Sequence, residues 1–206
     1  MKIIDCIQGS PDWMRARLGK PTASKFGEII SPTGKATSGK ARKSYQLELV
    51  GERICKSPQP HFVTPAMMRG TELESDARSW FVRESFVKVE KVGFCLSDCG
   101  RWGCSPDGLT EEGGIEIKCP GRVNFLAMLE DKTPEPNYIM QIQGCMFVTG
   151  RTEWEFILYS DDPGMPNTWW TIQRDEKLQE ALARELPIFC DEVDELERKI
   201  RANINA

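Results

Sequence analysis

Two acidic residues and a lysine lie in neighbouring segments near the middle of the chain, Ser105-Pro106-Asp107-Gly108-Leu109 and Gly114-Ile115-Glu116-Ile117-Lys118. Successive strand side chains point to opposite faces of a sheet, so Glu116 and Lys118 are predicted to share one face. Asp107, on the preceding strand of the expected hairpin, can approach that face. Such carboxylates suit a hard divalent cation like Mg²⁺, and a lysine beside them can orient a metal-bound water for hydrolysis of a phosphodiester.

An ordinary exposed Glu-Lys pair is the alternative interpretation, because the pattern Glu-x-Lys also arises by chance. Two features favour the metal site. The intervening Ile115 and Ile117 are expected to face a core, and a proline and a glycine flank Asp107.

The composition narrows the chemistry further. The chain has 206 residues and only one histidine, His61, which excludes His-rich metal sites and disfavours nucleophile systems that need a histidine base. Hydrolysis would therefore depend on carboxylates, lysine and metal. No apolar stretch is long enough for a signal peptide or a membrane span, so we expect the eight cysteines to be reduced and without a disulfide framework. The spacing of Cys95, Cys99 and Cys104 fits neither zinc nor iron–sulfur sites well.

The net charge of −4 argues at first against a nucleic-acid partner, but it hides an asymmetry. Residues 1–60 carry 11 Lys and Arg against 5 Asp and Glu, whereas residues 175–206 carry 5 against 9. A basic first third is compatible with anion binding and equally with solvated helices. The cations Lys35, Lys40, Arg42 and Lys43 stay unassigned.

Hydrophobic periodicity predicts the elements that must position these residues. Helices are expected at 11–18, 23–30, 38–55, 64–86, 123–131, 138–148 and 175–200, and strands at 88–96, 102–109, 114–119, 153–159 and 168–173. Thr22 is placed to cap the second helix. This order indicates an α/β fold with a mixed central sheet flanked by helices, in one domain spanning 1–206. Trp169 and Trp170 fit a core or subunit interface better than base stacking.

A second group of residues suits an anion. Arg17, Thr22 and Ser24 lie near the expected start of a helix, and a guanidinium with hydroxyls and free N–H groups can bind a phosphate. The alternative is that Thr22 only caps the helix and Arg17 is solvated.

The Pro-Asp, spacer and Glu-x-Lys pattern resembles the restriction-endonuclease-like nucleases, and more narrowly the lambda-exonuclease-like (YqaJ) phage recombination nucleases. Further blocks resemble that family in the expected order: Trp13-Met14-Arg15-Ala16-Arg17-Leu18-Gly19, Thr22-Ala23-Ser24, Arg69-Gly70-Thr71-Glu72-Leu73-Glu74-Ser75-Asp76-Ala77-Arg78 and Tyr138-Ile139-Met140-Gln141-Ile142-Gln143. Together they span roughly residues 13–150, and their order is far more specific than any one motif.

The resemblance implies a restriction-endonuclease-like core over about 64–175, N-terminal helices at 11–60 that contact DNA, and a C-terminal helix at 175–202. It implies two Mg²⁺ ions, replaceable by Mn²⁺, held by Asp107, Glu116 and the Ile117 carbonyl. Lys118, Glu74 and Gln141 would complete the catalytic centre, while Glu72 is expected to face solvent. Arg17, Thr22 and Ser24 would bind a 5′-phosphate, with Arg122 as a looser candidate for a DNA contact.

The implied activity is a 5′-to-3′ exonuclease that degrades one strand of linear double-stranded DNA to mononucleotides and leaves a 3′ overhang for strand annealing. The resemblance further implies a homotrimeric ring, a single-strand annealing protein as partner, and action in the cytoplasm of a bacterial host under phage or prophage coding. The rival interpretations are an endonuclease or junction resolvase of the same fold, and a non-catalytic DNA-binding protein.

Overall fold

The computed structural model describes residues 1–60 and 64–204, so the single histidine, His61, lies outside the described part. None of the helices in that part combines the length and hydropathy that a membrane span requires.

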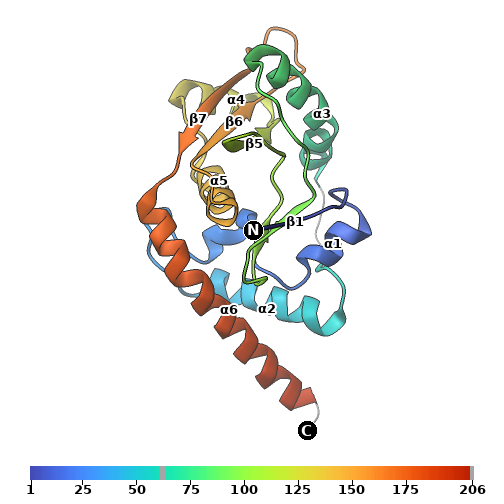
Figure 1. Ribbon diagram of the computed structural model, residues 1–206, viewed down its shortest axis with the longest axis vertical. Helices are drawn as coiled ribbons and strands as arrows, with labels where there is room; N and C mark the ends of the chain where they lie inside the picture. The colour runs from blue at the N-terminus through green and yellow to red at the C-terminus, as the bar shows by residue number, and fades with distance from the viewer. Residues whose placement is uncertain (61–63, 205–206) are drawn as a thin grey trace.

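A four-stranded mixed sheet carries the predicted catalytic hairpin (Figure 1). Its strands, in spatial order, are β4 (Gly108–Leu109), β5 (Gly113–Lys118), β6 (Glu153–Leu158) and β7 (Thr168–Gln173). β5 and β6 run parallel, while the β4–β5 and β6–β7 pairs are antiparallel. The expected mixed sheet and the expected hairpin of its first two strands are therefore confirmed.

A second, antiparallel sheet contains β1 (Lys2–Ile4), β2 (Phe94–Leu96) and β3 (Gly103–Cys104). The prediction of one strand over 102–109 is wrong, because β3 and β4 belong to different sheets. Between them, Ser105-Pro106-Asp107 leaves both ladders, and Pro106 has no N–H to donate to either. The catalytic aspartate candidate thus lies in the crossover from one sheet to the other.

The strand predicted over 88–96 is also shorter than expected. Only Phe94–Leu96 forms a strand, and Glu90 makes an isolated bridge to Leu109 with two 2.8 Å backbone hydrogen bonds. The segment therefore touches the edge of the larger sheet at Glu90 before it joins the smaller sheet at Phe94. The alternation of apolar residues predicted the extended backbone but could not locate this change of partner.

Helices fall close to their predicted positions: α1 (Pro11–Arg17), α2 (Lys40–Cys55), α3 (Pro65–Ser85), α4 (Arg122–Asp131), α5 (Pro136–Thr149) and α6 (Glu176–Ile204). Local signals explain two of the starts. The Ser10 hydroxyl accepts the Trp13 N–H at 3.3 Å, and the Thr64 hydroxyl accepts the Met67 N–H at 3.2 Å.

The helix predicted over 23–30 is a short 3₁₀ helix, η1 (Ala23–Glu28). Thr22 precedes it in extended conformation, but its side chain makes no capping hydrogen bond. The predicted cap is therefore wrong, and the Thr22 hydroxyl is available to another partner. Phe26 of η1 is fully buried and contacts α5 through the gap left by Gly144.

The mixed sheet lies between α3 and α5. Ile115, Ile117 and Ile157 pack with the apolar residues of α3 in one cluster. Trp154 and Phe156 of β6 belong to the other, larger cluster, which also holds the apolar residues of α5 and α6. Alternation along β5 and β6 thus gives the sheet two covered faces.

The structure also shows the surroundings of the cysteines, of Trp169 and Trp170, and of Arg42. All eight cysteines are free thiols, and Cys95 and Cys104 are fully buried as small apolar residues. Trp169 packs edge-on against Phe81, and Trp170 stacks on Phe156, so both rings contact the chain's own core. Arg42 is buried against Glu192 of α6 at 2.8 Å, which gives this unassigned cation a structural role.

Candidate active site

The hairpin brings Asp107 and Glu116 together. Asp107 immediately precedes β4, and its Oδ2 accepts a 2.6 Å hydrogen bond from the Ile117 N–H on β5. Glu116 lies on β5 with a side chain only 1% exposed. Its side chain and that of Lys118 meet on the sheet face opposite the one that Ile115 and Ile117 cover, as the alternation predicted.

One oxygen of Glu116 is fully used and the other is not. Lys118 Nζ lies 2.6 Å from Glu116 Oε1, and Gln141 Nε2 of α5 donates to the same oxygen at 2.7 Å. Glu116 Oε2 is buried and has no hydrogen-bond partner among the described residues. A buried carboxylate oxygen without a partner is costly unless a cation or water fills its place.

The charges in this cluster perturb one another. Burial raises the pKa of Asp107 well above its usual range, and the negative charges of Glu116 and Glu74 act in the same direction. Burial by itself lowers the pKa of Lys118, but the charges of Glu116 and Asp107 outweigh it and hold the pKa above the ordinary lysine value. The site therefore contains a protonated Lys118 and two carboxylates, Asp107 and Glu116, whose negative charges repel each other.

Glu74 reaches the site from α3 with the help of Arg78, one helical turn further along. Glu74 Oε1 accepts a hydrogen bond from Arg78, and Arg78 Nε donates to the Asp107 backbone carbonyl at 3.1 Å. Arg78 is buried, and through these two contacts it links Glu74 on α3 to the loop that carries Asp107. Glu72, in contrast, is exposed as predicted.

Sequence reasoning assigned no role to Arg78 or to Tyr138. The ring of Tyr138 lies 4.9 Å from Lys118 Nζ, a distance at which an aromatic face attracts a cation. Helical spacing held the signal for both, since Arg78 is four residues after Glu74 and Tyr138 three before Gln141. Gln143, by contrast, faces away and binds the backbone of Gln173 at 2.8 Å.

The oxygen atoms around Asp107 and Glu116 supply some, but not all, of the ligands that a hard divalent cation needs. No group of three His, Cys, Asp or Glu side chains in the described part of the chain is spaced as a metal site. Two carboxylates converge, however, and one of their oxygens is buried without a partner. Glu74 is engaged by Arg78, and a main-chain carbonyl such as that of Ile117 would supply a third oxygen. The set is therefore oxygen-only and suits Mg²⁺ or Mn²⁺ better than a thiophilic ion.

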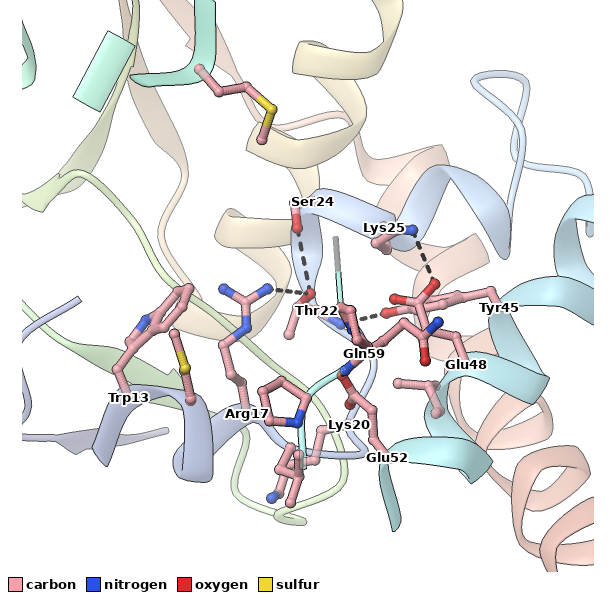
Figure 2. Close-up of a pocket in the computed structure, with 16 residues that line it drawn as sticks. Trp13, Arg17, Lys20, Thr22, Ser24, Lys25, Tyr45, Glu48, Glu52 and Gln59 are labelled. Carbon is pink, nitrogen blue, oxygen red and sulfur yellow. Dashed lines mark hydrogen bonds and ion pairs between the residues drawn. The ribbon is translucent and has the colours of Figure 1, made fainter. Parts of the chain in front are cut away.

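A cavity of about 930 Å³ lies where the second predicted site was expected (Figure 2). Arg17, Thr22 and Ser24 all line it. The other lining residues are Trp13, Met14, Leu18, Lys20, Lys25, Tyr45, Glu48, Leu49, Glu52, Pro58, Gln59, Pro60 and Met67. The structure thus brings the three predicted anion-binding residues together and adds two lysines that the sequence analysis did not single out.

Hydrogen bonds connect the predicted trio. Arg17 Nη2 donates to Thr22 Oγ1 at 3.3 Å, and that oxygen lies 3.4 Å from Ser24 Oγ. The guanidinium also stacks on Trp13, 4.1 Å from the ring centre. Tyr45 fixes the loop by accepting the Thr22 N–H at 3.1 Å.

The cavity keeps cations without acidic partners. Lys25 is paired with Glu48 at 3.3 Å, whereas Arg17 and Lys20 form no ion pair with any residue that the structure describes. Burial lowers the pKa of Arg17, and burial followed by the charge of Arg53 lowers that of Lys20. The charges of Glu52 and Glu48 raise the pKa of Arg17, but burial is the larger effect, so a bound anion would stabilise the charged guanidinium.

The cavity and the hairpin are connected through the loop before Asp107. The Trp13 indole N–H donates to Ser105 Oγ at 2.8 Å, and the Gly103 N–H donates to the Pro21 carbonyl at 3.1 Å. Arg122 does not line the cavity. It is exposed at the start of α4 and forms an ion pair with Asp162 at 2.9 Å, so its DNA contact stays a prediction.

The chain is similar to known proteins in both sequence and fold. Residues 12–152 match the model of the YqaJ-like viral recombinase domain. The alkaline exonuclease LHK-Exo from Laribacter hongkongensis is 32% identical with a TM-score of 0.86, covering 95% of this chain and 98% of that one. Its complex with dAMP is 31% identical, with the same TM-score and coverage.

A phage-related exonuclease from Haemophilus somnus 129PT has a TM-score of 0.72 at 16% identity, covering 88% of this chain and 96% of that one, and so supports the fold alone. None of the curated proteins compared with the chain gave a match. The likeness to LHK-Exo and the recombinase domain together support a phage-type exonuclease with the restriction-endonuclease-like fold. Since the family model covers more than half of the sequence, the chain belongs to the YqaJ-like viral recombinase domain family.

Proposed function

We propose that the protein is a Mg²⁺-dependent 5′-to-3′ exonuclease that digests one strand of linear double-stranded DNA to mononucleotides. The observation that carries this proposal is the unpartnered, buried Glu116 Oε2 beside Asp107 and Lys118. Such an oxygen calls for a cation, and carboxylates with a lysine are the groups that metal-assisted phosphodiester hydrolysis requires.

The metal ligands would be Asp107, Glu116 and the Ile117 carbonyl, with Glu74 assisting from α3. When bound, two Mg²⁺ ions, or Mn²⁺ in their place, would polarise the scissile phosphate and lower the pKa of a bound water. Gln141 holds Glu116 in place through its 2.7 Å hydrogen bond. Arg78 does the same for the Asp107 loop through the backbone carbonyl.

Lys118 would act on the reacting groups themselves. Its ammonium stays protonated, because the neighbouring carboxylates hold its pKa above the ordinary value. It can therefore donate hydrogen bonds to the attacking water or to the phosphate oxygens, but it is unsuited to accept a proton. Its position between Glu116 and the Tyr138 ring restricts where those donors point.

The cationic cavity would bind the terminal 5′-phosphate. Arg17 offers a fork of donors, and Thr22 and Ser24 offer hydroxyls beside it. A terminal phosphate carries more charge than an internal one, so this cavity should favour strand ends. The complex of LHK-Exo with dAMP supports a family site for a nucleoside monophosphate. Arg122 would contact the DNA backbone nearby once released from Asp162.

The wider setting follows the family. One nuclease domain over 1–206 would comprise N-terminal helices for DNA contacts, a core over about 64–175 and the C-terminal helix. The protein would leave a 3′ overhang for a single-strand annealing protein, work as a homotrimeric ring, and act in the bacterial cytoplasm as a phage or prophage product. The membership in a viral recombinase family supports this setting.

The decisive assay uses linear duplexes labelled at the 5′ or the 3′ end, with Mg²⁺ or EDTA, next to a closed circular duplex. We expect mononucleotides from the 5′ end first, no digestion in EDTA, and an intact circle. Cleavage of the circle would instead identify an endonuclease or resolvase. Binding without cleavage in Mg²⁺ would identify a non-catalytic DNA-binding protein.

A further inference from the structure

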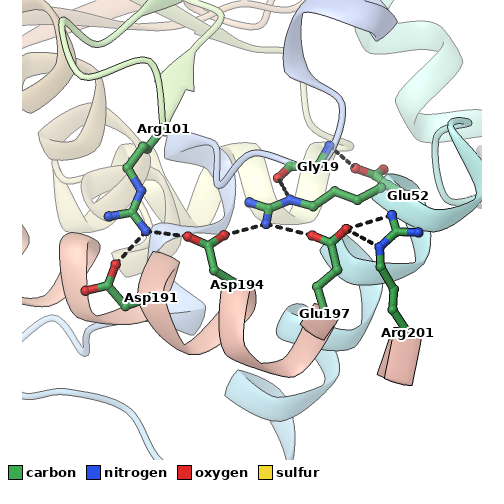
Figure 3. A network of polar contacts seen from close by, with 8 residues as sticks. Gly19, Glu52, Arg101, Asp191, Asp194, Glu197 and Arg201 are labelled. Atoms are coloured by element: carbon green, nitrogen blue, oxygen red, sulfur yellow. Dashed lines mark hydrogen bonds and ion pairs between the residues drawn. The ribbon is translucent and has the colours of Figure 1, made fainter. Parts of the chain in front are cut away.

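The backbone of Gly19 is held from both sides by consecutive residues of α2 (Figure 3). Its N–H donates to Glu52 Oε2 at 2.8 Å, and its carbonyl accepts from Arg53 Nε at 2.8 Å. A loop residue with both polar backbone groups bound to charged side chains has little freedom to move, because charge-assisted hydrogen bonds are short and strong.

Arg53 is itself fixed by the C-terminal helix. Its Nη1 donates to Asp194 Oδ1 at 2.7 Å and lies 3.2 Å from Glu197 Oε2, both on α6. Asp194 also binds Arg101 at 2.9 Å, and Glu197 binds Arg201 at 2.7 Å. Figure 3 shows these contacts as one row from Arg101 to Arg201, and Gly19 meets the arginine in the middle of that row. These contacts fix the orientation of the Arg53 guanidinium, with Nε directed at the Gly19 carbonyl.

The close approach requires glycine at position 19. Gly19 has φ of +65°, and a Cβ there would collide with the Cγ of Arg53. Any other L-residue would be strained by the left-handed backbone and would also displace the arginine. Both the left-handed backbone at position 19 and the close contact with Arg53 therefore require a glycine.

Gly19 separates the two cations that lack acidic partners in the cavity. The Lys20 N–H closes a tight turn onto the Arg17 carbonyl at 3.1 Å, and Gly19 lies inside that turn. A shift of Gly19 would therefore move Arg17 and Lys20 together. Glu52 also accepts the Gln59 N–H on its other oxygen at 3.0 Å, so one carboxylate holds two segments of the cavity lining.

We infer that Glu52 and Arg53 are positioning residues for recognition of the DNA 5′-phosphate, and that α6 takes part through Asp194 and Glu197. This inference rests on the proposed function of the cavity. Neither Glu52 nor Arg53 needs to touch the phosphate. Both carboxylate oxygens of Glu52 accept backbone N–H groups, which offsets the repulsion that a glutamate would otherwise exert on a bound anion. Glu52 and Arg53 together hold the turn from Arg17 to Lys20 in the position in which it would bind the phosphate.

The test compares variants that loosen the turn with one that weakens the same row of ion pairs elsewhere. Arg53→Lys cannot bind Gly19 and both α6 carboxylates at once, and Glu52→Gln keeps the size of the side chain but loses one of two acceptor oxygens. Arg101→Ala is the matched control. It removes ion pairs to Asp191 and to Asp194 Oδ2, at 2.7 and 2.9 Å, while Asp194 Oδ1 and Glu197 still bind Arg53.

The measurement is kcat and KM on linear duplexes with a 5′-phosphate or a 5′-hydroxyl, with thermal stability recorded in parallel. Arg53→Lys and Glu52→Gln should each reduce the preference for the phosphate by roughly tenfold through a higher KM, as expected when one charge-assisted hydrogen bond is lost. Arg101→Ala should keep the wild-type ratio at a similar loss of stability.

Two outcomes overturn the inference on its own: a wild-type preference that both Arg53→Lys and Glu52→Gln retain, or an equal loss of preference in Arg101→Ala. A wild-type enzyme with no preference for the phosphate would refute the proposed role of the cavity, and the inference with it. The two failures are therefore told apart by the wild-type ratio.

Discussion

The catalytic hairpin and the cationic cavity use charge in opposite ways. In the hairpin nearly every charged group has a partner within the chain: Glu116 binds Lys118 and Gln141, and Glu74 binds Arg78. In the cavity, Arg17 and Lys20 line an open volume of about 930 Å³ and form no ion pair with the described residues.

This difference separates two tasks. Mutual pairing in a buried site fixes atoms to a narrow range of positions, which suits chemistry. Cations without an acidic partner in an open cavity can instead bind an anion from solution. Changes in the hairpin should therefore slow digestion from any end, whereas changes in the cavity should alter which ends are digested.

The largest effect is expected from the two carboxylates. Asp107→Ala and Glu116→Ala each remove a ligand oxygen from a site that has few, so Mg²⁺-dependent cleavage should fall below detection. Binding of a labelled duplex in Ca²⁺, measured by anisotropy, should persist. Cleavage that survives in either variant, or in EDTA, would place the chemistry elsewhere.

Loss of the lysine should come next. Lys118→Ala removes one electrostatic contact to the reacting groups, and we expect turnover to fall about 10²- to 10³-fold with DNA affinity largely intact. Single-turnover digestion and anisotropy would measure the two quantities. Near-normal turnover would remove Lys118 from the mechanism and leave it as the structural partner of Glu116.

A smaller effect is expected from the residue that orients Glu116. Gln141→Leu removes the 2.7 Å hydrogen bond to Oε1 while preserving bulk, and we expect about a tenfold loss of activity with a higher Mg²⁺ requirement. A Mg²⁺ titration of the cleavage rate would show it. Gln143→Leu is not a suitable comparison because Gln143 binds the backbone of the core, so the exposed Glu72→Gln on α3 serves as the control.

The smallest effect concerns stability and has a defined pH dependence. The folded-state pKa of Asp107 is raised, so its ionised form destabilises the fold once the pH exceeds the ordinary carboxyl pKa. Asp107→Asn should therefore increase the free energy of unfolding at neutral pH by on the order of 1 kcal/mol in EDTA. The gain should shrink as the pH falls and vanish below about pH 4. Urea denaturation at several pH values would measure it; a variant less stable than wild type at neutral pH would contradict the assigned repulsion.

Much of this contrast could be read from the sequence. Alternation in the segment from Gly114 to Lys118 predicted which side chains share a face, and the structure confirms it. Periodicity located the helices, most clearly α6, whose buried residues recur at helical spacing along one face. The mixed sheet followed from the order of helices and strands.

The features that the sequence did not predict depend on contacts between distant segments of the chain. The residues 105–107 leave both ladders, and no local pattern shows that the flanking strands belong to different sheets. The partners of Arg53 lie more than 140 positions away on α6, so the hold on Gly19 had no signal in its own segment. Lys20 was missed because its role depends on which neighbours the fold brings to it, whereas Tyr138 had its helical spacing to Gln141 as a signal.

The most direct test of the division between chemistry and end selection is a side-by-side measurement of Lys118→Ala and Arg17→Ala. Digestion rates are measured for each on linear duplexes with a 5′-phosphate and with a 5′-hydroxyl. Lys118→Ala should slow both substrates by the same factor and keep the wild-type ratio. Arg17→Ala should slow mainly the phosphorylated duplex and bring the ratio toward one. If Arg17→Ala slows both ends equally, Arg17 is a general DNA contact and the cavity does not select strand ends.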